Sequence, residues 1–363
     1  MHKKILYMMI SILVIASMGL VGCQPQVVEV TKEVQVEVTR VVEGEVQTVV
    51  ITATPEAPKG VELPKSIVIG VLEPLTGQDA VFGEEAKIGV ELAIKHINES
   101  GGIKSLGGIP LEMVVEDAGS DADSARLGAE SIISKHHPLA IMGLYISRMT
   151  MAASEVTDRE KVILMADALV PAITQMGRQY VFRPGPDASV HGASAVKFVM
   201  EAAKEKGITV DTIAMVNEDS AFGRAVILGA NNEAINQGLT IVYQKEYPWD
   251  ITDATTIVNE IAKSGADFLV HCPYFNDAIV YAKAFAETGK TPPYVAGAGA
   301  CGYSDPGSIK AMGNLSEGFS NTYSYNPAKK TPQNEKFVSE FKQKMGYIPT
   351  EGAGMNYYDV WVL

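Results

Sequence analysis

A serine at the start of a predicted helix is the first place in this sequence that could hold charge. Ser147 directly precedes residues 148–159, which are predicted to form a helix. The first N–H groups of a helix have no partner inside it, so together with a hydroxyl they attract a carboxylate or another anion. The same serine would also serve as an ordinary N-cap. The sequence therefore leaves two interpretations, an anion site and a helix cap.

A second pattern matches a nucleotide-binding motif in its letters but not in its context. Residues 297–302 read G-x-G-x-x-G and follow a predicted strand. A pyrophosphate site needs a helix to begin at these glycines and an acidic residue about twenty positions later. Residues 303–306 delay the helix, and Tyr323 stands near the position of the acid. We therefore expect a glycine loop, which either lets the backbone approach a ligand or simply connects two elements.

Other patterns of catalytic or metal-binding residues are missing from the sequence. It contains no G-x-S-x-G elbow and no phosphate-binding P-loop, and none of its six histidines belongs to an H-E-x-x-H or C-x-x-C motif. After Cys23 only Cys272 and Cys301 remain, which is too few for a disulfide framework, so they either make one bridge or pack as thiols. We predict neither an enzyme nor a metal or cofactor site.

The composition is typical of a folded protein with two domains. The chain has 363 residues, of which 47% are hydrophobic and 20% are charged. A chain of this length usually divides into more than one core. The net charge is −13, whereas nucleic-acid binding needs basic patches that neutralise phosphates. We therefore expect no nucleic-acid partner.

The N-terminus has the pattern of a bacterial lipoprotein signal. A basic start at residues 2–4 precedes an apolar stretch, residues 5–21, that is short for a membrane span. The stretch ends in Leu-Val-Gly-Cys at residues 20–23, which resembles the lipobox, where the signal is cut before a cysteine that then receives lipid. An uncleaved signal anchor or an ordinary cleaved signal is the alternative. We predict a signal peptide over residues 1–22 and a lipid on Cys23, which would hold the protein on the outer side of a membrane.

Residues 23–63 differ in composition from the rest of the chain. Valine recurs there with a period of eight, at Val30, Val38 and Val46. An even period keeps these residues on one side of an extended strand and disagrees with helical spacing. We interpret the segment as an extended tether that reaches at most roughly 130 Å for about 40 residues. A coiled-coil or strand-pairing oligomerisation module is the alternative.

Residues 66–102 set the pattern of the folded part. An apolar, β-branched run over residues 67–72 predicts a buried strand, and helical spacing of apolar residues follows until the glycines at residues 101–102. The connecting loop, residues 73–82, lies at the carboxyl end of the strand. Ligands bind at this end of open α/β sheets, so we expect the loop to meet a ligand.

The same alternation of strands and helices continues along the chain. It predicts parallel sheets with right-handed crossovers. Proline and glycine interrupt the alternation at residues 181–186, and a helix near residue 340 is too late to belong to the second sheet. We therefore predict an α/β protein with two doubly wound lobes, residues 66–184 plus 327–363 and residues 187–325, joined by a hinge of more than one strand.

Several segments resemble one known family in their order along the chain. They are IGVLEPLTG, IMGLYISRMTMAASEV, YVFRPGPDASVHG, NEDSAFG and GFSNTYSYNP. Residues 66–363 resemble the leucine/isoleucine/valine-binding protein family, solute-binding components of ABC importers with the type I periplasmic binding protein fold. The resemblance implies a small-molecule ligand and ABC permease and ATPase partners, and a ligand-sensing receptor on the same fold is the alternative. The family normally continues beyond the point where this sequence ends, and the last residues, 357–363, are apolar, so we expect a truncated C-terminus.

The resemblance also implies a set of ligand-binding residues. Ser147 matches a serine that holds the ligand's carboxylate, and Phe82, Phe222 and Tyr274 match aromatic walls, although each aromatic residue could equally be ordinary packing. Further matching positions lie in three segments, and the residues are Tyr145, Asp167, Ala168, Leu169, Ala298 and Gly299.

Two of these positions depart from the family pattern. Leu169 stands where amino-acid binders offer a threonine, and neither Ala298 nor Gly299 supplies the acid that binds the ligand's amine. A buried ammonium without a partner is costly, unless Asp167 takes over this role. The expected ligand is therefore a branched-chain or hydrophobic amino acid or a related organic carboxylate or amide.

Overall fold

The computed structural model of the protein describes residues 63–77, 79–300 and 302–363. The predicted signal peptide, the lipid on Cys23 and residues 23–62 of the tether lie outside the described residues. The same holds for Cys301, and therefore for its pairing with Cys272, whose side chain is buried.

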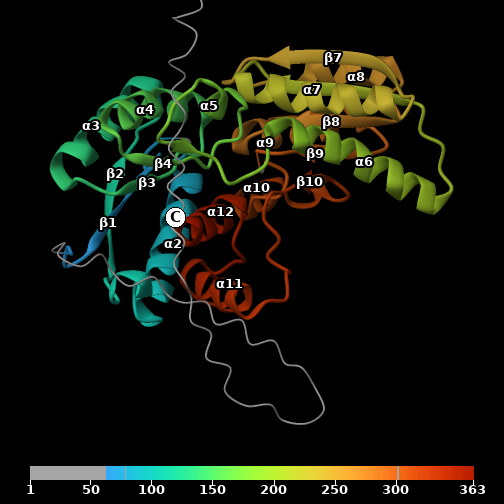
Figure 1. Cartoon of the computed structure of the whole chain (residues 1–363). Helices are drawn as coiled ribbons and strands as arrows, with labels where there is room; N and C mark the ends of the chain where they lie inside the picture. The colour runs from blue at the N-terminus through green and yellow to red at the C-terminus, as the bar shows by residue number, and fades with distance from the viewer. Residues whose placement is uncertain (1–62, 78, 301) are drawn as a thin grey trace, which may run out of the picture. The chain divides into compact units, whose positions relative to one another are not determined.

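The first sheet has five parallel strands in the order β2-β1-β3-β4-β5 (Figure 1). The strands are β1 (Ile67–Glu73), β2 (Leu111–Asp117), β3 (Ala140–Met142), β4 (Ile163–Met165) and β5 (Val181–Phe182). The predicted buried strand is β1, and it lies between β2 and β3. Side chains of successive residues point to opposite faces of a strand. Accordingly, Ile141 and Leu164 join one hydrophobic cluster while the neighbouring Met142 and Met165 join another.

Helices cover both faces of this sheet. They are α2 (Ala80–Glu99), α3 (Ala122–His136), α4 (Ser147–Glu160), α5 (Ala172–Gln175), α11 (Pro332–Met345) and α12 (Glu351–Val362), with a 3-10 turn η1 (Lys104–Leu106). The late helices return to the first sheet, because Phe337, Phe341 and Tyr357 share a hydrophobic cluster with Ile88 of α2. Helices α11 and α12 thus pack against α2.

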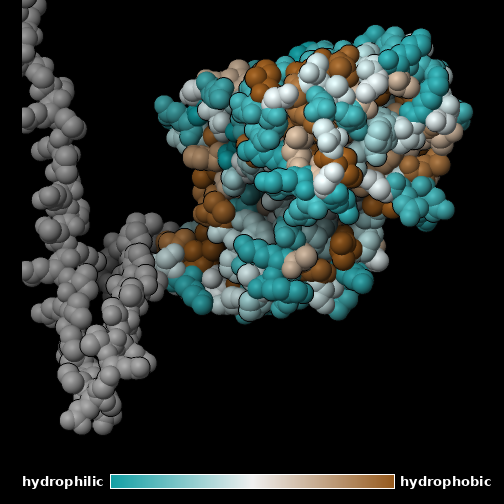
Figure 2. Space-filling view, turned by 90° about the vertical axis from the view of Figure 1, so that its right-hand side faces the viewer, coloured by the Kyte–Doolittle hydropathy of each residue, from teal (hydrophilic) through white to brown (hydrophobic). Residues whose placement is uncertain are grey.

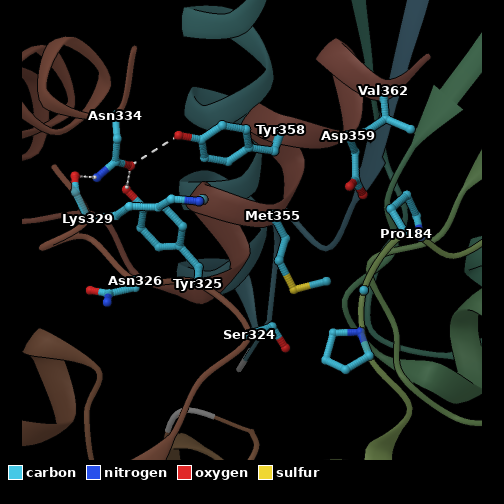
Figure 3. A pocket seen from close by; sticks show the side chains of 13 residues that line it. Pro184, Ser324, Tyr325, Asn326, Lys329, Asn334, Met355, Tyr358, Asp359 and Val362 are labelled. Carbon is cyan, nitrogen blue, oxygen red and sulfur yellow. Dashed lines mark hydrogen bonds between the residues drawn. The ribbon is translucent and has the colours of Figure 1, made fainter. Parts of the chain in front are cut away.

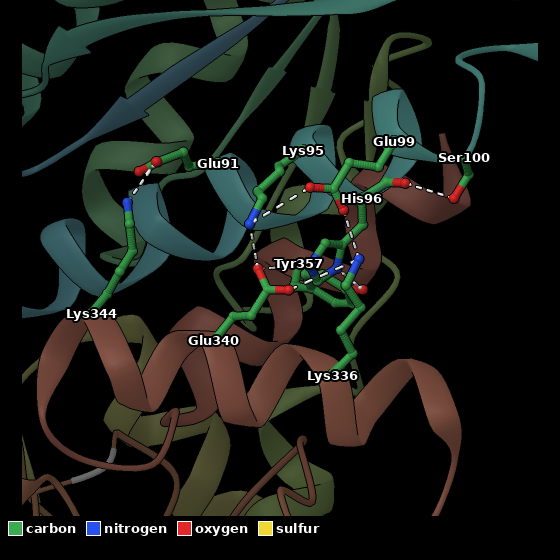
Figure 4. A network of polar contacts seen from close by, with 9 residues as sticks. All are labelled: Glu91, Lys95, His96, Glu99, Ser100, Lys336, Glu340, Lys344 and Tyr357. Carbon is green, nitrogen blue, oxygen red and sulfur yellow. Dashed lines mark hydrogen bonds and ion pairs between the residues drawn. The ribbon is translucent and has the colours of Figure 1, made fainter.

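Ion pairs also connect α11 with α2 along their exposed sides (Figure 4). Lys95 lies 2.8 Å from Glu340, and Lys336 lies 2.7 Å from Glu99. Exposed pairs of this kind each contribute at most about 1 kcal/mol. The apolar contacts below them are therefore the main attachment of α11.

The second sheet repeats the architecture of the first, with five parallel strands in the order β10-β9-β8-β6-β7. The strands are β6 (Thr212–Glu218), β7 (Thr240–Tyr247), β8 (Phe268–Cys272), β9 (Val295–Ala298) and β10 (Ser320–Thr322). The surrounding helices are α6 (Ala188–Lys206), α7 (Ala221–Asn236), α8 (Thr255–Ser264), α9 (Phe275–Thr288) and α10 (Pro306–Met312), with a 3-10 turn η2 (Gly313–Ser316). The prediction of two doubly wound parallel-sheet lobes is thus confirmed.

Two local expectations differ from the structure. Val181 and Phe182, expected to begin a crossover, form β5 and pair with β4 before the chain leaves the lobe. The apolar end of the sequence is helix α12, which the sequence reading did not predict. Burial explains part of its apolar character, since Ala353, Tyr357 and Val360 are each at most 4% exposed, whereas Trp361, Val362 and Leu363 are exposed.

Among the described residues, no helix is both long and apolar enough to cross a membrane. On the face of the protein shown in Figure 2, hydrophobic residues lie in separate groups among hydrophilic ones. Scattered exposed apolar side chains are normal for a folded protein surface.

Candidate functional site

A small pocket lies between residues of the two lobes, and we call it the interlobe pocket. Its volume is about 10 Å³. The first lobe contributes Tyr145, Ser147, Asp167, Leu169, Glu351 and Met355, and the second lobe contributes Phe222, Tyr274 and Ala300. A neighbouring cavity of about 100 Å³ shares Ser147, Phe222 and Tyr274 and adds Arg148 and Trp249. Ser147 therefore lines both cavities.

The start of α4 brings Ser147 into this pocket. Ser147 is the first residue of the helix, and Ile146 occupies the N-cap position without a side-chain hydrogen bond. The N–H groups of Met149 and Thr150 donate to the Ile146 carbonyl, at 2.9 and 3.0 Å. Ser147 is therefore not the N-cap. The first N–H groups of α4 and the Ser147 hydroxyl together provide donors suited to an anion.

Asp167 lies two residues after β4, at the carboxyl edge of the first sheet. Its side chain is 2% exposed, and Asn356 of α12 donates to its Oδ2 at 2.8 Å. Its Oδ1 is buried without a hydrogen-bond partner in the described part of the protein. Burial and the negative charges of Glu73, Asp359 and Glu351 raise the pKa of Asp167 well above its usual value. The raised pKa favours the protonated, neutral form of Asp167 at this cluster of carboxyl groups, which we call the acidic edge.

Two further carboxyl groups belong to this edge. Glu73 ends β1 and accepts a hydrogen bond from the Tyr145 N–H at 3.1 Å, and burial raises its pKa to about 8. Glu351 begins α12, is 1% exposed and accepts a hydrogen bond from the Ser324 N–H. The His191 ring lies 3.8 Å from the same carboxyl group. Elements from both ends of the sequence thus converge on the acidic edge.

Aromatic rings form a continuous series across the pocket. Phe82 stacks on Tyr145 with ring centroids 4.6 Å apart, and Tyr145 meets Tyr274 of the second lobe edge-on at 6.3 Å. Tyr274 in turn lies 5.7 Å from Phe222 and 4.6 Å from Trp249. The Arg148 guanidinium sits 4.3 Å from the centre of the Trp249 ring. The second lobe therefore presents mostly aromatic surface to the first.

The structure brings together most, but not all, of the residues that sequence reasoning selected. Six of them line the interlobe pocket: Tyr145, Ser147, Asp167, Leu169, Phe222 and Tyr274. The other four do not line it. Phe82 lies in α2 behind Tyr145, Ala168 and Ala298 are fully buried, and Gly299 lies behind Phe222 with a φ of +68° that favours glycine.

The sequence reading missed three residues that line the interlobe pocket, Ala300, Glu351 and Met355. In the neighbouring cavity it missed, among others, Arg148 and Trp249. Arg148 is adjacent to the predicted anion site, so its position could have been inferred. Glu351 and Met355 reach the pocket only because α12 returns to the first lobe. The acid at the start of a helix is common and favourable, and such a residue carries no signal of a binding site.

A larger cavity, of about 420 Å³, lies beside the segments that connect the two lobes (Figure 3). Asn334 organises part of its wall, because its Oδ1 accepts hydrogen bonds from Tyr325 at 2.7 Å and Tyr358 at 3.3 Å. These bonds join a connecting segment to α11 and α12. The cavity is away from the carboxyl ends of the central strands, where α/β sheets bind ligands. We therefore regard the interlobe pocket as the better candidate site.

Comparison with known proteins identifies the family of this chain. A family model described as "periplasmic binding protein" matches residues 66–363, the whole folded part. The chain belongs to the periplasmic binding protein family. Among curated relatives, Leu/Ile/Val-binding protein homolog 8 of Brucella abortus is 31% identical over 301 residues, covering 80% of this chain and 72% of the relative.

Solved structures of other periplasmic binding proteins have the same fold. The leucine binding protein LivK of Thermotoga maritima superposes with a TM-score of 0.71 at 23% identity, over 82% of this chain and 81% of that one. A solute binding protein of R. palustris in complex with 4-hydroxybenzoate gives a TM-score of 0.70 at 21% identity, over 82% and 79% of the two chains. LivJ of Streptococcus pneumoniae in complex with isoleucine gives 0.70 at 19% identity, over 82% of each chain.

Proposed function

We propose that this protein is the extracytoplasmic solute-binding component of an ABC importer. The observation that carries the proposal is the interlobe pocket, in which residues of both lobes surround the start of α4. A solute that contacts both lobes would stabilise the state in which they are close together. The protein would then present this state to a membrane permease and its ATPase.

The solute is a small organic molecule with a carboxylate. Ser147 and the first N–H groups of α4 hold the carboxylate, and Tyr145, Leu169, Phe222 and Tyr274 enclose the apolar part. The relatives named above bind an aliphatic amino acid or an aromatic acid, according to their descriptions. Branched-chain amino acids and aromatic carboxylates are therefore the first candidates. The protein binds and releases the solute without changing it chemically.

The N-terminal sequence supports attachment to the membrane. Cleavage before Cys23 and lipidation of its sulfur would anchor the chain, and residues 23–63 would act as a tether. Expression of the full chain with radiolabelled palmitate tests this part. Label and detergent-phase partitioning should disappear in a Cys23→Ala variant. Equal labelling of both forms would contradict the lipid anchor.

Ligand capture is tested by mass spectrometry and thermal shift on the full chain. The native protein should release a small solute on denaturation, and that solute should raise the unfolding midpoint of stripped protein. The expected stabilisation is about 3 kcal/mol when the free solute is at a hundred times its dissociation constant. No shift with the recovered solute or with a broad panel of amino acids, amides and organic acids would contradict the proposal.

A ligand-sensing receptor subunit is the second candidate, since it would use the same fold and the same pocket. Genes beside the coding sequence distinguish the two roles. Permease and ATPase genes favour import, whereas a kinase or receptor gene favours sensing. Uptake of labelled solute that is lost on deletion of the gene would decide for transport.

A further inference from the structure

Four polar side chains form a hydrogen-bonded network inside the second lobe, and we call it the second-lobe network. Its members are Tyr247 at the end of β7, His271 in β8, Asp277 in α9 and Tyr303. Each of them is at most 4% exposed. Hydrogen bonds only partly return the free energy that it costs to bury polar groups, so apolar residues of the same volume would often be at least as stable. Stability alone therefore does not explain these residues.

Every member of the network is within hydrogen-bond distance of another member. The Tyr247 hydroxyl lies 2.5 Å from Asp277 Oδ2 and 2.9 Å from His271 Nε2. The other ring nitrogen of His271, Nδ1, lies 2.5 Å from the Tyr303 hydroxyl. Burial lowers the pKa of His271 well below its usual value. The ring is therefore neutral, with one N–H donor and one acceptor nitrogen.

These distances allow a complete set of donors and acceptors in either charge state of Asp277. When Asp277 is ionised, Tyr247 donates to it and accepts from the His271 Nε2–H, while Nδ1 accepts from Tyr303. When Asp277 is protonated, all three bonds reverse and every group keeps a partner. Burial raises the pKa of Asp277 to about 7, so both states are accessible near neutral pH. A network in which every group is satisfied holds its members rigidly.

The network joins three segments that reach the candidate site. Trp249, Tyr274 and Ala300 line the interlobe pocket or its neighbouring cavity, whereas no member of the network lines either one. Each of these lining residues stands two or three positions from a network member, and the pairs are Tyr247 with Trp249, His271 and Asp277 with Tyr274, and Tyr303 with Ala300. The Tyr274 backbone also forms a hydrogen bond to the Asp277 carboxyl group. The network thus connects the ends of β7 and β8 with α9 and the glycine loop.

We propose that the second-lobe network positions the segments that carry Trp249, Tyr274 and Ala300, with Tyr247 as its central residue. This inference rests on the proposed function, because it specifies how the wall that meets the solute is held. A wall that is fixed before binding loses little freedom when the lobes close, so more of its interaction with the solute appears as affinity. The four members are positioning residues, since none of them lines the pocket.

Tyr281 distinguishes positioning from simple filling of the core. Its ring packs in the same cluster, with centroids 5.2 Å from the Tyr247 ring and 4.2 Å from the His271 ring. Its hydroxyl, however, is buried without a hydrogen-bond partner in the described part of the chain. Tyr281 therefore contributes packing and takes no part in the network. The same substitution at Tyr247 and at Tyr281 separates the two roles.

Fluorescence of Trp249 in the solute-free full chain tests the inference directly. Trp361, the other tryptophan, is replaced by phenylalanine in every sample. Tyr247→Phe removes the central hydroxyl and keeps the ring, so we expect acrylamide to quench Trp249 about two- to threefold more strongly. Tyr281→Phe is the matched control and should leave the quenching unchanged. Tyr303→Phe, which removes the hydroxyl at the end of the network, should act in the same direction and replaces Tyr247→Phe if that variant does not fold. Quenching that is unchanged in the folded network variant would overturn the inference.

Binding should follow the same order, with leucine and 4-hydroxybenzoate as probes of the two solute classes proposed above. By titration calorimetry, Tyr247→Phe should bind the tighter probe about tenfold more weakly, and Tyr281→Phe should bind it equally well. Asp267→Ala is the stability control, because Asp267 accepts hydrogen bonds from the N–H groups of Asp211 and Thr212 at the other end of β8. Equal losses of affinity in Asp267→Ala and Tyr247→Phe would overturn the inference. If neither probe binds the unaltered protein, that result counts against the proposed function, and the quenching of Trp249 still decides the inference.

Discussion

The two walls of the interlobe pocket differ in chemistry although they come from lobes of the same fold. The wall of the first lobe carries the polar groups, with Ser147 at the start of α4 and two buried carboxyl groups beside Tyr145, Leu169 and Met355. The wall of the second lobe is aromatic. Even the corresponding helix starts differ, since Ser220 caps α7 by accepting hydrogen bonds from the N–H groups of Phe222 and Gly223, whereas α4 has no such cap.

This difference indicates that the two lobes have different roles in binding. Polar groups that recognise charge are directional, and in this protein they belong to the first lobe. Aromatic rings bury area without strong directional demands and can close over solutes of different shape. The first lobe would therefore determine which charged groups a solute must carry. The second lobe would contribute affinity on closure.

Loss of the central aromatic ring should have the largest effect on binding. Tyr274→Ala removes the ring that meets Tyr145, Phe222 and Trp249. We expect the affinity for the recovered solute to fall about 30- to 100-fold, because a buried aromatic side chain contributes about 2–3 kcal/mol. Titration calorimetry gives this number for a solute that carries an amine and for the same skeleton without the amine.

The ratio between the two affinities tests whether the two lobes have these different roles. If the wall of the second lobe does not contact the charged groups of the solute, this ratio should be the same in Tyr274→Ala as in the unaltered protein. Tyr243→Ala is the control, since Tyr243 bonds to Glu260 on the outer part of the second lobe and its loss should leave affinity unchanged. A ratio that falls to about one in Tyr274→Ala would contradict the claim that the first lobe alone recognises the charged groups of the solute.

The acidic edge should make the stability of the solute-free protein depend on pH. Burial raises the pKa of Glu73 from 4.5 to about 8, and that of Asp359 from 3.8 to about 7. At a pH between the ordinary pKa of each group and its raised pKa, the folded state binds more protons than the unfolded state. The free energy of unfolding therefore falls as pH rises. The two shifts together correspond to a loss of at most about 5 kcal/mol from pH 5.5 to 8.5, measured by urea unfolding.

Glu73→Gln should flatten this dependence, because a neutral amide needs no proton to be buried. The buried His271 of the second lobe has a lowered pKa and acts in the opposite direction, since protonation below pH 6.5 favours unfolding. Measurements above pH 7 therefore report mainly the carboxyl groups. Stability that rises between pH 7 and 8.5 in the unaltered protein would contradict the raised pKa values.

The fold could be predicted from sequence because its signals are local. The β-branched run of β1 and the helical spacing after it are each contained in one short segment, and their repetition implies parallel sheets. Helix α12 was missed because Gly352 and Gly354 weaken a helix pattern. Glycine is needed at position 354 because of a tertiary contact: a Cβ atom there would lie 2.2 Å from the Tyr325 ring.

The candidate site could be predicted only in part, because some of its residues come from distant segments of the sequence. Ser147 and Asp167 follow strands of the first sheet, and the carboxyl ends of parallel strands meet at one edge. Glu351 comes from the far end of the chain, so its approach to Asp167 depends on how the last segment folds back. Phe82 seemed equivalent to Phe222 in sequence, yet one ring lies behind Tyr145 and the other lines the pocket.

Removal of the Ser147 hydroxyl should weaken carboxylate binding by a smaller amount. Ser147→Ala leaves the N–H groups of α4 in place, so we expect a five- to tenfold loss of affinity, equivalent to about 1 kcal/mol for one hydrogen bond. Folding stability should change by less than about 1 kcal/mol, because Ser147 does not cap the helix. The control is Ser220→Ala, which removes the cap of α7 and should destabilise the protein. Unchanged affinity in Ser147→Ala would show that the hydroxyl does not contact the solute.

The contact between Arg148 and Trp249 is expected to have the smallest effect. It links the two walls, since Arg148 belongs to α4 and Trp249 follows β7. Arg148→Gln removes a cation–π contact at a partly exposed site, which contributes about 0.5–1 kcal/mol, so affinity should fall about two- to fivefold. Stopped-flow fluorescence of Trp249 should show a faster dissociation rate and a nearly unchanged association rate, because the contact forms when the walls meet. Arg126→Gln is the control, because Arg126 forms an exposed ion pair with Asp123 and both residues belong to helix α3. A change confined to the association rate would mean that Arg148 attracts the solute and does not join the lobes.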